Sequence, residues 1–232
     1  MNDSTDTPAD TSIGWSAIVT AGPDAASFLQ GQLSQDITTV NTLGQWALLL
    51  APDGSVITSS YVTATSDGYV LEVPRELGEV ALARLKRFLL RTKCTFELSE
   101  IDRGPFNTVS EQIHAGRPGS AEFAYGLTPQ CFGSSFVTSS VSFTKGCFTG
   151  QELVGRLDAR GSSVPWRMIR ATGPSEARVN ELLTSKGPAG PSGLTTSLRG
   201  ATSIVGLGFA HRSLLGSADL ERALDVHIEE IA

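Results

Sequence analysis

Alternating and helical spacings of hydrophobic residues divide the first hundred positions into short strands and two helices. Extended, largely apolar runs predict strands at 13–20, 46–50, 56–62, 69–73 and 94–98. Two helical segments follow Pro23 and Pro74, because proline suits the first turn of a helix. The second segment is amphipathic, with an apolar face formed by Leu77, Val80, Ala81, Leu85, Phe88 and Leu89. This order predicts an α+β fold in which helices pack on an antiparallel or mixed sheet.

Turn and loop signals separate these elements and mark a less regular middle. Pro52-Asp53-Gly54 predicts a hairpin, because proline presets its φ and glycine tolerates a positive φ. Residues 101–140 are rich in Gly, Ser and Pro, and they predict a long loop with short strands at 106–109 and 132–137. The segment from residue 166 onward alternates short apolar runs with turns, which is typical of a small β-barrel.

The expected organisation is therefore a disordered tail at 1–12, a large region at 13–165 and a small C-terminal β-barrel at 166–232. The large region is expected to hold two subdomains, at about 13–100 and 101–165. A chain of 232 residues with 40% hydrophobic residues is long enough for one large or two modest domains with a real core.

Composition and charge narrow the function classes. The formal net charge is −6, from 24 acidic and 18 basic residues, which makes nucleic acid an unexpected partner and favours a small-molecule protein. No apolar run approaches the roughly 18 residues of a spanning helix, and residues 1–12 lack a leader pattern, so we expect a cytoplasmic protein without a membrane partner. The cysteines at 94, 131 and 147 are far apart, and only three histidines occur, so neither a disulfide nor a metal site is expected.

One segment of the second half combines a cation, a thiol, two glycines and an amide–carboxylate pair within eight residues. It runs from Lys145 through Cys147 to Gln151 and Glu152, with Arg156 one helical turn further on. A turn followed by a helix start explains the glycines and Glu152, because a carboxylate in the first turn complements the helix dipole. That interpretation gives no reason for Lys145 and Cys147. A nearby cation and a helix amino terminus both lower the pKa of a thiol, so Cys147 is either a reactive thiol or a small buried apolar side chain.

The string K-G-C-F-T-G-Q-E at 145–152 resembles the signature of the YgfZ-type folate-binding proteins, which are relatives of the aminomethyltransferase T-protein of the glycine cleavage system. Further segments resemble boxes of that family in the right order, at 22–32, 127–130, 193–197 and 206–210. The central box is specific, whereas the others are weak when each is taken alone.

The resemblance implies a folate-binding region at 13–165 followed by the C-terminal β-barrel, with tetrahydrofolate or a derivative as the cofactor. It also implies a role in the assembly or repair of iron–sulfur cluster enzymes, with client or assembly proteins as partners. The residues implied at the ligand are Lys145, Cys147, Gln151, Glu152 and Arg156. Most have a structural alternative: Lys145 on a solvated turn, Gln151 and Glu152 as helix caps, and Arg156 in an i,i+4 pair with Glu152. No catalytic residue is assigned beyond the functional thiol of Cys147.

The chain departs from the T-protein pattern at 54–59, where that family carries an aspartate. Thr58 and Ser59 present hydroxyls there, and a neutral hydroxyl can neither hold an ammonium group nor act as a carboxylate base. A folate-dependent aminomethyltransferase, one-carbon transferase or demethylase is therefore the alternative function rather than the first. A scaffold that has lost its ligand is the second alternative.

Two other polar features are left open by the sequence. Residues 112–118 resemble a family segment R-I-x-x-G-x-P with Gln112 in place of arginine, and Arg117 is the candidate to supply the missing charge. The cations at 84–93 either form a solvated helix face or attract polyanions such as folate tails or RNA. The acidic net charge makes RNA the weaker of these partners.

Overall fold

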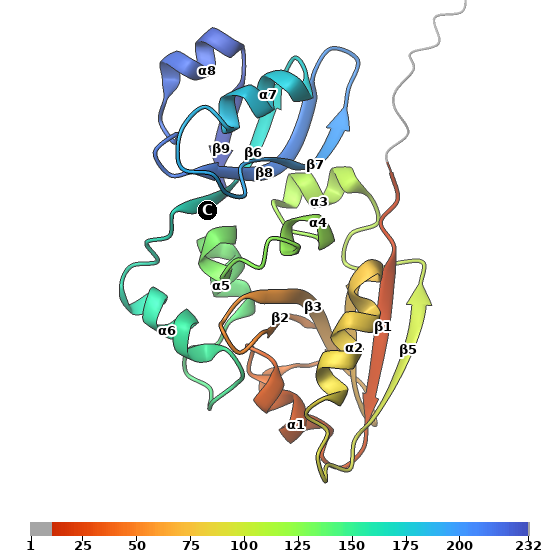
Figure 1. The fold of residues 1–232 in the computed structure, drawn as a ribbon. Coiled ribbons are helices and arrows are strands. Elements are labelled where there is room, and N and C mark those ends of the chain that lie inside the picture. Colours follow the sequence, from red (N-terminus) through yellow and green to blue (C-terminus); the bar gives the residue numbers. More distant parts are fainter. Residues whose placement is uncertain (1–10, 232) are drawn as a thin grey trace, which may run out of the picture.

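The computed structural model describes residues 11–231, which form two antiparallel sheets with short helices between and around them (Figure 1). Of the expected tail at 1–12, residues 1–10 lie outside the described residues. Thr11 and Ser12 pair with the backbone at 108–109. Across residues 11–231, no helix has both the length and the apolar character needed to cross a membrane.

The first sheet has five strands in the order β2-β3-β4-β1-β5, and every pair is antiparallel. Its strands are β1 (Trp15–Ala21), β2 (Gln45–Leu50), β3 (Val56–Ala64), β4 (Gly68–Pro74) and β5 (Thr95–Ile101). The expected hairpin joins β2 to β3, and its turn contains Gly54 at φ 83°. The Asp53 carboxylate accepts a hydrogen bond from Ser55 N at 3.1 Å in the same turn. The predicted α+β fold is confirmed, and this sheet is antiparallel rather than mixed.

Helices α1 (Ala25–Gln32) and α2 (Gly78–Lys86) pack on this sheet, next to the 3₁₀ turns η1 (Ile37–Thr39) and η2 (Arg75–Leu77). Their apolar side chains share a core with the strands, which includes Ile18, Phe28, Leu29, Leu33, Leu49, Leu71 and Leu85. Burial of one such side chain contributes about 1.5–3 kcal/mol. The predicted apolar face of the second helix is partly wrong, because Val80 is 50% exposed, and Phe88, 40% exposed, lies beyond the end of α2.

The middle of the chain is helical, so the predicted long loop with short strands at 106–109 and 132–137 is wrong. It forms α3 (Val109–Ala115), α4 (Ser120–Phe123), η3 (Pro129–Phe132), α5 (Ser134–Ser140) and α6 (Gln151–Ala159). Several of these helices have two turns or fewer, which is too short to show a helical period in sequence. Their buried residues, such as Phe123, Phe132 and Phe136, form a second core that also takes Leu48 from the first sheet and Phe209 from the C-terminal sheet.

The C-terminal segment forms an open four-stranded sheet in the order β7-β8-β6-β9 and not the expected closed barrel. Its elements are β6 (Trp166–Gly173), α7 (Glu176–Leu183), β7 (Gly193–Arg199), β8 (Ile204–His211), α8 (Ala218–Leu224) and β9 (His227–Glu230). Strands β7 and β9 are the edges, and among the described residues they do not pair with each other. Helix α7 packs Val179, Leu182 and Leu183 against the sheet, so a helix fills the space that more strands would occupy in a barrel.

Candidate functional site

The signature segment at 145–152 closes the carboxyl end of helix α1. Lys145 Nζ donates to three backbone carbonyls at 2.6, 2.7 and 2.8 Å, those of Gln30, Leu33 and Gln35. The backbone N–H of Thr149 donates to the carbonyl of Gly31 at 3.2 Å. The last carbonyls of a helix have no partner within it, so the segment satisfies these acceptors from a distant part of the chain.

The position of Lys145 corresponds neither to a solvated turn nor to an open anion site. Its ammonium group has three N–H donors, and all three are used by carbonyls. Burial lowers the pKa of Lys145 to about 8, and the negative charge of Asp36 partly opposes this shift. The ammonium group also lies 5.2 Å from the ring centroid of Phe148. In this arrangement Lys145 anchors the signature segment to α1 and has no donor left for a ligand carboxylate.

Gly150 sets the start of α6 and its packing against the β2–β3 turn. It is the N-cap of α6 at φ 81°, and a Cβ atom there would lie 2.5 Å from the carbonyl oxygen of Ala51. Gln151 Oε1 accepts from the backbone N–H of Phe148 at 3.1 Å, which is a local capping contact. Position 150 therefore requires glycine for both its backbone angle and its space.

Glu152 and Arg156 pair with each other on the exposed face of α6. Arg156 Nη2 donates to Glu152 Oε1 at 2.6 Å, at the i,i+4 spacing expected for a helix. Both side chains are mostly exposed, and an exposed pair of this kind contributes little to stability. The structural alternatives for Gln151 and Arg156 are thus the contacts that the fold makes, whereas Glu152 pairs with Arg156 instead of capping the helix.

Cys147 is exposed, whereas Cys94 and Cys131 are buried. Burial raises the pKa of Cys131, and burial together with the Asp24 carboxylate raises the pKa of Cys94. A groove of about 260 Å³ lies beside the signature segment, and its lining includes Lys145, Phe148, Gln151, Glu152 and Arg156. The structure therefore brings four of the five predicted ligand residues to one groove, and it places the Cys147 thiol outside that lining.

A larger hollow of about 490 Å³ lies between the first sheet, the middle helices and the C-terminal sheet. We call it the central cleft; its lining includes Trp46, Phe106, Arg117, Phe136, Arg170 and Glu229. A second cavity of about 240 Å³ shares Trp46 and Phe106 with it. The rings of these two residues are stacked, with centroids 5.9 Å apart and planes inclined by 16°. The central cleft thus has an aromatic wall at the place where the two cavities meet.

Arg117 is a half-buried cation in the central cleft without a carboxylate partner. Its guanidinium lies 4.2 Å from the ring centroid of Trp46, and Nη1 donates to Ser139 Oγ at 3.1 Å. Within the part of the chain that the structure describes, no ion pair includes Arg117. Burial lowers the pKa of Arg117 to about 10, so the group stays charged at neutral pH. A desolvated guanidinium that lacks a counter-ion favours an anion, and its planar fork matches a carboxylate.

Gln112 positions the backbone of Arg117. The buried Gln112 side chain donates from Nε2 to the carbonyl oxygen of Arg117 at 3.1 Å. Helix α3 ends at Gly116, whose φ of 62° turns the chain so that residue 117 follows directly after the helix. Gln112 therefore braces the backbone at residue 117, and Arg117 carries a positive charge five residues after it. Sequence reasoning singled out this segment but missed Trp46 and Phe106, which looked like ordinary strand residues.

Thr58 and Ser59 lie buried, and neither lines the central cleft. Thr58 Oγ1 donates to the carbonyl oxygen of Ser59 at 2.9 Å, so its hydroxyl is satisfied within the strand. Where the T-protein pattern carries a carboxylate, this chain therefore has covered, neutral groups.

The fold is that of the aminomethyltransferase T of the glycine cleavage system. The crystal structure of that protein from Bartonella henselae superposes with a TM-score of 0.55 and covers 86% of this chain and 76% of that chain, at 12% sequence identity. At this identity the likeness establishes the shared fold alone.

Two curated relatives are similar in sequence, while no protein-family model matches the chain. A protein of Pyricularia oryzae, described as a mitochondrial iron-sulfur cluster assembly factor IBA57 homolog, is 23% identical over 202 residues, which cover 62% of this chain and 52% of that protein. An uncharacterized protein of Haemophilus influenzae is 24% identical over 183 residues, which cover 61% of this chain and 65% of that protein. The chain therefore spans between about half and two thirds of the length of these relatives.

Proposed function

We propose that this protein binds a folate, tetrahydrofolate or a derivative, in the central cleft, and that it supports the assembly or repair of iron–sulfur cluster enzymes. The observation that carries the ligand half is Arg117, a desolvated cation stacked on Trp46 with no carboxylate partner among the described residues. A folate combines aromatic rings with one or more glutamate carboxylates, which are the two kinds of group that this wall favours.

The central cleft offers such a ligand a cation, an aromatic side chain and a suitable volume. Arg117 would hold a glutamate carboxylate, and Phe106, which is stacked on Trp46, would pack against a flat ring. The volume of about 490 Å³ falls within the range of roughly 300–1,000 Å³ that is usual for small-molecule sites. When bound, a reduced folate supplies a carrier for one-carbon units.

The sequence predicts Lys145 at the ligand, whereas this proposal assigns the contact with the folate carboxylate to Arg117. Lys145 has no free donor, whereas the guanidinium of Arg117 has donors left after its bonds to two serine hydroxyls. The groove lined by Gln151, Glu152 and Arg156 stays a secondary candidate for ligand contact.

The iron–sulfur half of the proposal draws support from the Pyricularia oryzae relative and from the exposure of Cys147. We infer that the signature segment faces client or assembly proteins and presents the Cys147 thiol to them. Its backbone is tied to α1 by Lys145 and Thr149, so the thiol sits on a fixed loop rather than a loose one. Such fixation favours recognition, because less conformational freedom is lost on binding.

Aminomethyl or other one-carbon transfer is disfavoured by Thr58 and Ser59, whose hydroxyls are buried and neutral. In the T-protein pattern a carboxylate at that strand position handles the amine, and this chain has none there. A turnover assay with glycine-cleavage intermediates tests this alternative, and a measurable rate would restore it.

The ligand test is an anaerobic calorimetric titration of the full chain with tetrahydrofolate. Wild type is expected to bind saturably, and Arg117→Gln is expected to weaken binding by about 10- to 100-fold, the usual range for one lost charge-assisted hydrogen bond. Arg117→Lys keeps the charge but loses the planar fork, so its affinity should lie between the two. Arg103→Gln, at an exposed arginine that is not part of the cleft lining, is the matched control. If the wild type does not bind, the protein is better described as a scaffold without a ligand. If Arg117→Gln binds as tightly as the wild type, the folate site does not include Arg117.

The iron–sulfur test uses a deletion strain of the source organism under oxidative stress. Activities of cluster-dependent enzymes are expected to fall and to recover with the wild-type gene but not with Cys147→Ser. Normal activities in the deletion strain would overturn this half while leaving the titration result intact.

A further inference from the structure

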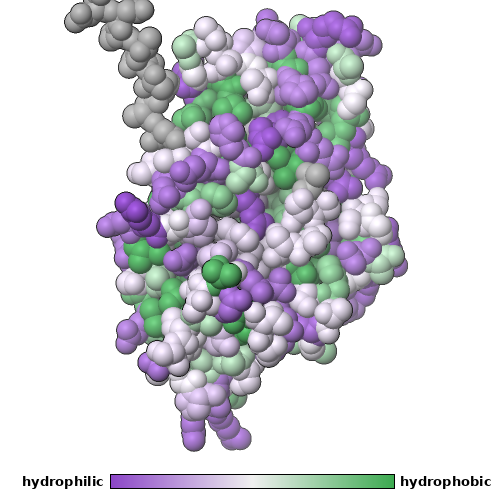
Figure 2. Space-filling view, turned by 180° about the vertical axis from the view of Figure 1, so that it is seen from behind, coloured by the Kyte–Doolittle hydropathy of each residue, from purple (hydrophilic) through white to green (hydrophobic). Residues whose placement is uncertain are grey.

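Residues 86–93 begin at the last residue of α2 and lead toward β5, and they form a protruding turn at the end of the molecule opposite the C-terminal sheet (Figure 1). We call this segment the basic tip. Seen from behind, the molecule narrows at this end, and hydrophilic groups project from it (Figure 2). The central cleft and the signature groove include no residue of the basic tip in their linings. The proposed function therefore leaves it without a role.

Four of the eight residues in the basic tip are exposed cations: Lys86, Arg87, Arg91 and Lys93. Among residues 11–231, none of these four side chains takes part in an ion pair. The charge of Arg87, together with burial, lowers the pKa of the neighbouring Arg84, so like charges here are close enough to repel. The nearby Asp24 carboxylate accepts from the backbone N–H of Lys93 at 2.7 Å. A chain with a net charge of −6 thus places four exposed cations at one end, with the Asp24 carboxylate beside them.

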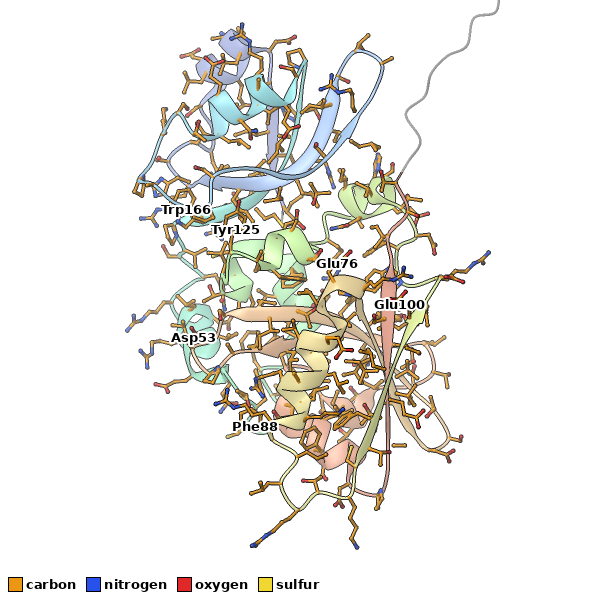
Figure 3. All side chains as sticks on the ribbon, turned by 45° about the vertical axis from the view of Figure 1, so that its right-hand side comes forward. Asp53, Glu76, Phe88, Glu100, Tyr125 and Trp166 are labelled. Atoms are coloured by element: carbon orange, nitrogen blue, oxygen red, sulfur yellow. The ribbon has the colours of Figure 1, made fainter. Side chains whose placement is uncertain are left out.

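The basic tip also exposes large apolar side chains. Leu90 is 82% exposed and Phe88 is 40% exposed, while Leu89 between them packs against the first core. Figure 3 shows Phe88 near the base of α2, with nitrogen-tipped side chains extending outward beyond it. The Arg84 guanidinium lies 4.1 Å from the centroid of the Phe88 ring. A leucine at the apex, with cations on both sides, forms an amphipathic surface rather than a uniformly solvated one.

Backbone contacts hold this turn in one shape. Asp24 N donates to the carbonyl of Lys93 at 3.3 Å, and in return the backbone N–H of Lys93 donates to the Asp24 carboxylate. Arg91 has φ 58°, in the left-handed region, and Thr92 Oγ1 donates to the carbonyl of Leu90 at 3.2 Å. A non-glycine residue rarely adopts this conformation, so the surrounding contacts must stabilise it. The outward position of Leu90 is therefore a property of an ordered turn.

We propose that the basic tip docks on the surface of an anionic lipid bilayer, with Leu90 entering the headgroup region and the four cations meeting lipid phosphates. Charge complementarity and shape support this occupant together. Each basic side chain near an anionic membrane strengthens binding by about five-fold, and an inserted leucine adds apolar burial. A small convex turn buries little area against a protein, whereas a bilayer requires no matching concave surface. Nucleic acid is less favoured, because Leu90 offers no stacking surface and Arg84 already covers a face of Phe88.

The test is flotation of the full chain with vesicles of phosphatidylcholine, with and without about one third phosphatidylglycerol. We expect binding to the anionic vesicles alone, weakened by added salt because exposed charges are screened. Arg87→Gln combined with Arg91→Gln should lower the apparent affinity about 25-fold. Leu90→Gln should lower it about 10-fold.

Leu43→Gln is the matched control, because Leu43 is 81% exposed but lies in the turn before β2. This variant should bind anionic vesicles like wild type. Equal loss in Leu43→Gln and Leu90→Gln, or no binding to anionic vesicles, would overturn the proposal. Binding to a single-stranded RNA homopolymer that depends on Arg87 and Arg91 but not on Leu90 would assign the tip to nucleic acid instead.

Discussion

Lys145 lies among three backbone carbonyls at the carboxyl end of α1, and these acceptors decide what its charge can do. A cation placed there complements the negative end of the helix dipole and satisfies carbonyls that the helix leaves without partners. Lys145, the cation of the signature segment, is therefore a structural anchor. The cation that can meet a ligand is Arg117.

Lys145→Met should lower the free energy of unfolding by about 2 kcal/mol, because three partly buried carbonyls lose their donor. Urea denaturation measures this change. The matched control is Lys186→Met, since Lys186 is exposed and donates to the Ser217 hydroxyl at 2.9 Å, so its loss should cost less than about 0.5 kcal/mol. A similar loss of unfolding free energy in the two variants would show that the three hydrogen bonds from Lys145 to backbone carbonyls do not add to stability.

The pKa of Lys145, lowered to about 8 from an ordinary 10.5, also makes stability depend on pH. Between these values the unfolded chain keeps the proton that the folded chain has released, so this group makes folding more favourable as pH rises. The difference in unfolding free energy between wild type and Lys145→Met should therefore grow from pH 8 toward pH 10.5. A difference that stays flat over this range would mean an ordinary lysine pKa.

At the scale of elements, the signature segment links α1, α6 and the β2–β3 turn. Thr149 and Lys145 hold it to α1, and Gly150 brings the start of α6 against Ala51. Asp53 lies in the same turn, beside α6 in Figure 3. The exposed Cys147 is thus carried by a loop that is held to α1 on both sides of the cysteine and continues into α6.

Gly150→Ala should destabilise the protein by about 2–3 kcal/mol, because alanine is strained at φ 81° and its Cβ would press on the Ala51 carbonyl. Gly155→Ala, inside α6 with no atom near the added Cβ, should instead stabilise by about 0.5–1 kcal/mol. Thermal and urea unfolding of both variants measure these opposite signs. Destabilisation by both substitutions would point to a general intolerance of α6 rather than to the Gly150 contact.

At the scale of the whole molecule, Glu122 joins the middle helices to the C-terminal sheet. This fully buried carboxylate accepts hydrogen bonds from the hydroxyls of Thr195 and Thr196 and from the backbone N–H of Gly119. An irregularity in β7 at residue 195 allows two successive threonines to reach one carboxylate. Tyr125, labelled at the same junction in Figure 3, packs on Phe209 of β8 with ring centroids 5.5 Å apart.

Glu122→Gln should loosen this junction, because an amide NH₂ cannot accept the hydrogen bonds that one carboxylate oxygen takes. The expected cost is about 1–3 kcal/mol, the usual penalty for a buried polar group without its partner. Hydrogen exchange should show faster opening of β7 than of the first sheet. Glu97→Gln, at an exposed position of β5, should change neither. Uniform acceleration in both sheets would contradict a local role for Glu122.

Much of the first sheet could be predicted because its strands and helices carry their own patterns. The apolar runs, the prolines before α1 and α2, and the Pro52-Asp53-Gly54 turn all act locally, so the sequence shows them directly. The middle helices were missed because each is too short to display a period. The exposed Val80 was missed because helical spacing indicates that a face is apolar but not what covers it.

The sequence by itself determined the α+β class, the hairpin and the unusual chemistry of residues 145–156, since these depend on residue type and short spacings. Only the tertiary structure decided which charges are free. Lys145 is occupied by carbonyls more than a hundred residues away, while Arg117 meets Trp46 without a carboxylate partner among the described residues. Whether a charged group is buried, and whether it has a partner, depends on residues that the fold brings together from distant positions. The order of residues along the chain does not give the distances between them in space.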